Sequence, residues 1–127
     1  MAKVLVVDDD NSIVLLLTHI LTRAGHTVKV ANDGREGLAS AREDKPDLII
    51  LDIMMPEMDG ITASGVMFQD PVLRLIPVII LTAKGTARGM MELLPNVRVY
   101  MDKPFDAPEL IQNVTRLLGL PTVLKEA

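Results

Sequence analysis

Short runs of apolar residues, each ending abruptly on polar side chains, constrain the fold of this chain more than any other feature. The runs Val4–Val7, Leu48–Leu51 and Val78–Leu81 contain no polar residue, which is typical of strands buried on both faces of a sheet. Two further segments, His26–Ala31 and Val97–Met101, alternate apolar and polar residues, as strands at a sheet edge do. In Val97–Met101, the alternation predicts that the apolar side chains lie on one face of the sheet. The pattern predicts five strands, three of them interior.

Helical patterns separate these strands. A first helix is predicted by apolar residues at helical spacing, namely Ile13, Leu16, Leu17, Ile20, Leu21 and Ala24. Weaker patterns follow up to Glu43 and from Gly60 to Gln69, and the clearest one runs from about 107 to 118. Strands that alternate with helices predict an α/β fold, a doubly wound five-stranded parallel sheet with helices on both faces. Interior and edge patterns together favour the flavodoxin-like order 2-1-3-4-5.

The length of 127 residues fits one domain, which we expect over residues 1–119 with a C-terminal tail at 120–127. A net charge of −4 argues against direct nucleic-acid binding, which needs a clustered basic face. There is no cysteine, no apolar run of the ~20 residues that span a membrane, and no room for a signal peptide before the first strand. We therefore expect a cytoplasmic protein that does not bind membranes.

Polar residues follow the strands that this order brings together. Asp8 and Asp9 follow the first strand, Asp52 the third, Thr82 ends the fourth and Lys103 lies just past the fifth. Carboxylates crowded into one crevice repel by about 3 kcal/mol per pair at ~5 Å and an effective dielectric of ~20, so they either hold protons or bind a cation. Ligands that are all oxygens indicate Mg²⁺. A carboxylate beside Mg²⁺ can form an aspartyl-phosphate, with Lys103 offsetting the charge and the hydroxyl of Thr82 donating to it.

Simpler interpretations exist for each residue alone. The run Asp8–Asp10 is equally consistent with capping the first helix, and Lys103 with a solvated loop. His19 and His26 lack acidic neighbours in helical register and are not predicted as ligands. The convergence of all candidates on one edge of one sheet favours a site.

Four motifs in order, V-L-V-V-D-D-D, L-D-I-M-M-P-E-M-D-G, V-I-I-L-T-A and M-D-K-P-F, resemble the receiver domain of two-component response regulators, the CheY-like superfamily. The likeness covers Lys3 to about Leu118. It implies a phosphoacceptor switch: Asp52 receives a phosphoryl group from a histidine kinase, a phosphotransfer protein or a small phosphodonor, and the partner-binding face changes. Such a domain catalyses only its own phosphoryl transfer and dephosphorylation, and its output passes to a downstream effector protein.

The resemblance also implies roles for single residues. Mg²⁺, or Mn²⁺ in its place, would be held by Asp8, Asp9, Asp52 and the backbone carbonyl of Met54. Thr82, Lys103 and the backbone N–H of Ala83 would bind the phosphoryl oxygens, and Thr82 and Tyr100 would form the switch. The bond between Lys103 and Pro104 would be cis. Pairing of two copies through the switching face is left open.

The chain departs from the family pattern between Thr82 and Lys103. Gly85 and Gly89 interrupt the helix expected at 84–94, so we expect it to be short or mobile, and Pro95-Asn96 replaces the usual turn before the fifth strand. Met54 and Lys84 flank the path of an attacking water, which predicts slow autodephosphorylation.

Two other functions compete with the switch. Asp8 and Asp10 form a D-x-D after the first strand, as in phosphatases of the haloacid dehalogenase type, although these are normally longer and Asp52 would then have no role. The second is a receiver-like module that binds partners without phosphorylation, against which the full set of acids, hydroxyl and lysine argues.

Overall fold

The computed structural model describes residues 2–52, 60–83 and 95–119, and for residues 60, 61, 82 and 83 the backbone alone. The elements in chain order are β1 (Lys3–Val7), α1 (Asn11–Arg23), β2 (Thr27–Ala31), α2 (Gly34–Asp44), β3 (Leu48–Leu51), α3 (Gly60–Gln69), the 3₁₀ helix η1 (Leu73–Leu75), β4 (Val78–Ala83), β5 (Val97–Lys103) and α4 (Ala107–Leu117). The helix expected at 84–94 lies outside the described residues.

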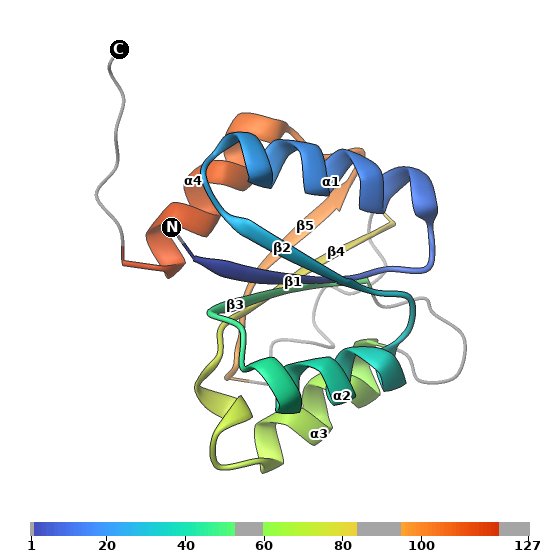
Figure 1. Cartoon of the computed structure of the whole chain (residues 1–127), viewed down its shortest axis with the longest axis vertical. Helices are drawn as coiled ribbons and strands as arrows, with labels where there is room; N and C mark the ends of the chain where they lie inside the picture. The colour runs from blue at the N-terminus through green and yellow to red at the C-terminus, as the bar shows by residue number, and fades with distance from the viewer. Residues whose placement is uncertain (1, 53–59, 84–94, 120–127) are drawn as a thin grey trace.

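The five strands form one parallel sheet in the order β2-β1-β3-β4-β5, so the predicted fold is confirmed (Figure 1). The three uninterrupted apolar runs supply β1, β3 and β4 in its middle. Because the strands are parallel, all five carboxyl ends lie at one edge of the sheet.

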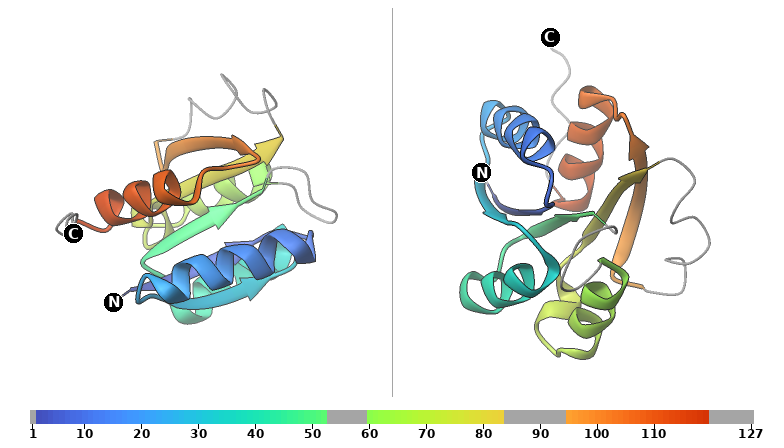
Figure 2. Two further views of the ribbon diagram at one scale, coloured as in Figure 1. Left: turned by 90° about the horizontal axis from the view of Figure 1, so that it is seen from above. Right: turned by 90° about the vertical axis from the view of Figure 1, so that its right-hand side faces the viewer.

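Helices cover both faces of this sheet (Figures 1 and 2). Successive residues of a strand point to opposite faces, so Val4 and Val6 join the core under α1 and α4, while Leu5 and Val7 join the core over α2 and α3. Among the described residues, no helix is long and apolar enough to span a membrane.

Aspartates cap three of the helices. Asp10, Asp33 and Asp106 begin α1, α2 and α4, and each side chain accepts hydrogen bonds from backbone N–H groups of the first turn. At the other end of α1, Gly25 has a φ of +96°, a left-handed conformation that favours glycine just past a helix end. Helix starts and the Gly25 turn therefore follow directly from local sequence.

Strand β5 differs from its prediction in two ways. A register shift opposite Val78 and Ile79 places a bulge at the start of β5, so Val97 packs in the α2–α3 core while Val99 and Met101 pack in the α1–α4 core. The prediction of one shared apolar face was wrong, because the extra residue of a bulge reverses the alternation. The strand also continues through Asp102 to Lys103, which pairs with Ala83, so Lys103 is the last strand residue rather than a loop residue.

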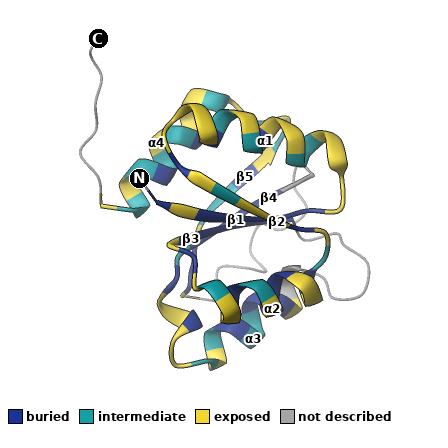
Figure 3. Cartoon of the chain, in the orientation of Figure 1, coloured by how far each residue is buried: buried dark blue, intermediate teal, exposed yellow. Residues whose placement is uncertain are grey.

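Two residues predicted as buried are exposed. Leu16 is 46% exposed, and Val30, which lies on the edge strand β2, is 41% exposed. Figure 3 shows exposed positions along both α1 and β2. Leu17 and Leu21 carry the contact of α1 with the sheet, and both are fully buried.

Candidate phosphoacceptor and metal site

Three carboxylates meet at the carboxyl edge of the sheet. Asp8 and Asp9 follow β1, and Asp52 follows β3, which pairs with β1 so that Val7 lies beside Leu51. Oxygen atoms of the three side chains lie within 4.8 Å of one another. Asp8 is 2% exposed and Asp52 6%, whereas Asp9 faces solvent. The strand pairing thus brings together acids that are more than forty positions apart in the chain.

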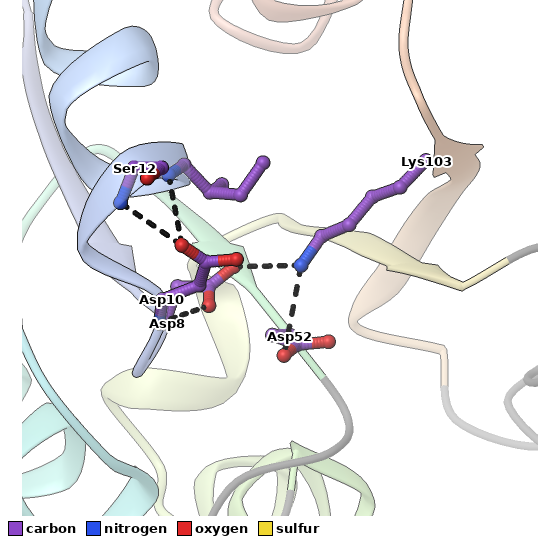
Figure 4. A network of polar contacts seen from close by, with 6 residues as sticks. Asp8, Asp10, Ser12, Asp52 and Lys103 are labelled. Atoms are coloured by element: carbon purple, nitrogen blue, oxygen red, sulfur yellow. Dashed lines mark hydrogen bonds and ion pairs between the residues drawn. The ribbon is translucent and has the colours of Figure 1, made fainter.

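Lys103 completes this cluster from the end of β5. Its Nζ lies 3.1 Å from Asp8 Oδ2 and 3.7 Å from Asp52 Oδ2, with 21% of the side chain exposed (Figure 4). The peptide bond from Lys103 to Pro104 is cis, as expected. The ammonium therefore lies between the two buried carboxylates.

Asp10 separates from the other two acids of its run. Its Oδ1 accepts hydrogen bonds from the N–H groups of Ser12 and Ile13, at 2.9 and 3.4 Å, so it caps α1. Its carboxylate is not part of the cluster of three. The capping interpretation thus holds for Asp10, whereas Asp8 and Asp9 join the site. A phosphatase site of the D-x-D type needs the carboxylates of both Asp8 and Asp10. Because the Asp10 carboxylate caps α1, it does not join Asp8 in such a site.

The charges of this cluster do not balance. Among the described residues, three carboxylates face one ammonium, and two of the carboxylates are removed from water, which strengthens their repulsion. The donor set consists of carboxylate oxygens without nitrogen or sulfur, which suits a hard cation such as Mg²⁺. The residues present therefore fit a divalent metal ion.

Other predicted residues are described in part. Thr82 and Ala83 are the last residues of β4, and their backbones pair with Asp102 and Lys103, so both positions lie at the same edge as the acids. Their side chains, and all of Met54, lie outside the described residues. Tyr100 is partly buried and packs against the α2–α3 core.

Neither histidine belongs to the cluster, as predicted. His26 is buried, and burial lowers the pKa of its imidazole, while His19 is exposed.

Two exposed leucines in the first half of α1 were missed. Leu15 is 72% exposed and Leu16 46% exposed, both within the first two turns of α1. A signal was present, since the five consecutive apolar residues from Ile13 to Leu17 exceed what one helix face can bury.

Residues 4–115 match the family model for the response regulator receiver domain. The chain belongs to this family. It is 41% identical to the alkaline phosphatase synthesis transcriptional regulatory protein PhoP of Bacillus subtilis over 117 residues, 91% of this chain but about half, 48%, of that protein. It is 35% identical to protein PilH of Pseudomonas aeruginosa over 120 residues, 94% of this chain and 99% of PilH.

Solved structures agree. The receiver domain of the sensor histidine kinase PA1611 of P. aeruginosa superimposes with a TM-score of 0.84 at 28% identity, covering 93% of this chain and 98% of that one. That structure holds a magnesium ion in its active site cleft. This chain is thus a receiver domain of the two-component response regulators, a regulatory domain, as its motifs indicated.

Proposed function

We propose that Asp52 accepts a phosphoryl group from the phosphohistidine of a histidine kinase or phosphotransfer protein, and that the new charge changes the partner-binding face. The observation that carries this proposal is the surrounding of Asp52. It is a nearly buried carboxylate with two acids within 4.8 Å and an ammonium at 3.7 Å. If Asp52 had a purely structural role, there would be no need for two further acids beside it.

The chemistry is a displacement at phosphorus. An oxygen of Asp52 forms a bond to phosphorus as the bond from phosphorus to the donor imidazole nitrogen breaks, and the electron pair stays on that nitrogen. The ammonium of Lys103, already beside Asp52, offsets the negative charge on the transferring group. A bound Mg²⁺ ion would add further neutralisation of the negative charge on the transferring group. Its ligands would be Asp8, Asp9, Asp52 and the backbone carbonyl of Met54, and Mn²⁺ is an alternative ion.

The response to phosphorylation would use the ends of β4 and β5. The N–H of Ala83 and the hydroxyl of Thr82 would bind phosphoryl oxygens, together with Lys103. Thr82 and Tyr100 would then act as the switch, because Tyr100 is only partly buried where it packs against the α2–α3 core, which leaves its ring room to change position. The mechanism is a shift between two states that the added dianion stabilises differently.

Exposed apolar residues support a protein as phosphodonor. Leu15 and Leu16 project from α1 within two turns of the acidic cluster, where a kinase or phosphotransfer protein must approach. The output partner is a downstream effector protein, and pairing of two copies is one further form of output. We propose no direct contact of this chain with nucleic acid or membrane, given its charge of −4. PhoP is named a transcriptional regulator, but the chain spans only 48% of PhoP.

The proposal also covers extent and location. The receiver domain would occupy residues 1–119, followed by a tail at 120–127. The protein would be located in the cytoplasm, and fractionation of cells tests this location.

The test uses a small phosphodonor. Wild-type protein incubated with acetyl phosphate and Mg²⁺ gains the mass of one phosphoryl group, and the Asp52→Asn variant does not. The gain requires the metal, so EDTA prevents it. Unchanged mass in the wild type, with Mg²⁺ binding intact, would leave a receiver-like binding module as the function.

A further inference from the structure

Asp10 lies between the helix α1 and the acidic cluster and forms hydrogen bonds with both. Toward the helix, its side chain accepts from the N–H groups of Ser12 and Ile13, and its carbonyl accepts from the N–H of Val14 at 3.0 Å. Toward the cluster, its own N–H donates to Asp8 Oδ1 at 2.9 Å. Both backbone groups and the side chain of this exposed residue are therefore engaged.

Asp8 is consequently held from two sides. Its Oδ1 accepts from Asp10, and its Oδ2 faces the ammonium of Lys103 at 3.1 Å. Asp8 is almost fully buried, so its carboxylate is shielded from bulk water. These two contacts, one at each oxygen, define the rotation of the Asp8 carboxylate.

The cap fixes the direction of that bond. Asp10 has an extended backbone, with φ −91° and ψ 108°, which is the usual geometry of a capping residue. The two hydrogen bonds from the first turn of α1 hold the side chain and, through it, this backbone. Figure 4 shows dashed lines from one carboxylate oxygen of Asp10 to the backbone at the start of α1.

We propose that Asp10 is a positioning residue that orients Asp8 for the divalent cation through its backbone N–H, with its side chain acting on the helix and not on the metal. The inference rests on the proposed function, since it concerns the same cation site. The third acid of the run thus acts by geometry, whereas Asp8 and Asp9 act by charge.

Two variants of Asp10 separate geometry from charge. Asp10→Ala removes the cap and the charge, while Asp10→Asn keeps an oxygen that can cap α1 and removes only the charge. We expect Asp10→Ala to bind Mg²⁺ about fivefold or more weakly, as loss of outer contacts to metal ligands does. We expect Asp10→Asn to stay within about twofold of wild type, because the cap is kept and the exposed Asp10 carboxylate is not among the acids of the cluster.

Asp33→Ala is the matched control. Asp33 caps α2 with the same chemistry, accepting from the N–H of Glu36 at 2.8 Å, but its carboxylate does not belong to the cluster of Asp8, Asp9 and Asp52. It should lower the denaturant midpoint about as much as Asp10→Ala and leave Mg²⁺ affinity unchanged.

Isothermal titration with MgCl₂ on the full chain, with no phosphodonor, measures these affinities. Weaker binding confined to Asp10→Ala supports the proposal. Wild-type affinity in Asp10→Ala, or equally weak binding in Asp10→Asn, would overturn it and leave the proposed function intact. Equal weakening by Asp33→Ala would also overturn it. A wild-type chain that binds no Mg²⁺ would overturn the proposed function together with this inference.

Discussion

Lys103 and Asp8 lie 95 positions apart in the chain, yet their side chains are 3.1 Å apart, from Nζ to Oδ2. The side chain of Asp8 is 3% exposed and that of Lys103 is 21% exposed. A second ion pair, Lys3 with Asp44, is 3.5 Å long and much more exposed, at 48% and 43%. The two pairs differ in solvation, so they should differ in their contribution to stability.

Replacing Lys103 with methionine should destabilise the metal-free protein by about 1–3 kcal/mol, because the buried carboxylates then lose their counter-ion. The free energy of unfolding from urea titrations in EDTA measures this change. Lys3→Met is the control, with an expected loss of less than ~1 kcal/mol. Equal losses in the two variants would show that the cluster does not depend on the ammonium.

Replacing Gly37 with alanine should destabilise the fold by about 1–3 kcal/mol through overpacking. An added Cβ would lie 2.9 Å from Val7 Cγ2, and Val7 is buried and stiff about χ1. Gly65→Ala is the matched control, since its Cβ would meet nothing within 4 Å inside α3. That variant should gain up to ~1 kcal/mol from helix propensity. Urea denaturation of both variants checks the opposite signs.

Stability should fall as pH decreases below about 6.5, the ordinary pKa of histidine, because burial lowers the pKa of His26 in the folded protein. The unfolded chain then binds a proton that the folded chain resists, so unfolding is favoured at low pH. The effect is absent above that range, where both states are neutral. Denaturant midpoints between about pH 5 and 7.5 measure it.

His26→Gln should flatten this pH profile. His19→Gln is the control, because His19 is exposed and should leave the profile unchanged. A wild-type profile that His26→Gln does not alter would assign the pH dependence to other groups.

Slow loss of the phosphoryl group is expected from the sequence. Met54 cannot hydrogen-bond an attacking water, so the phosphorylated protein should persist far longer than seconds with Mg²⁺ present. Intact mass followed over time after removal of the phosphodonor measures the half-life. Met54→Asn, which can hold a water, should shorten it.

The sheet was predictable because burial and strand order are linked. A strand without polar residues needs cover on both faces, and only interior positions provide it, so β1, β3 and β4 could be placed from their residues. The site then followed, since parallel strands bring Asp8, Asp52 and Lys103 to one edge.

Other details depend on packing that local sequence does not report. The bulge in β5 depends on how Val97 pairs with Val78 across the sheet, and no residue near Arg98 indicates it in the sequence. Likewise, the helical spacing of the apolar residues in α1 does not reveal that Leu16 is 46% exposed. The sequence left open which acids of the run Asp8–Asp10 join the site and which one caps α1. Asp8 and Asp10 carry the same carboxylate and differ only in the direction in which it points.

The most direct measurement of the central claim is the position of the phosphoryl group. Protein treated with acetyl phosphate and Mg²⁺ is reduced with borohydride, which converts an aspartyl-phosphate into homoserine, and the modified residue is located by peptide mass spectrometry. We predict homoserine at position 52 alone. Homoserine at position 8 or 9, with Asp52 unmodified, would contradict the account.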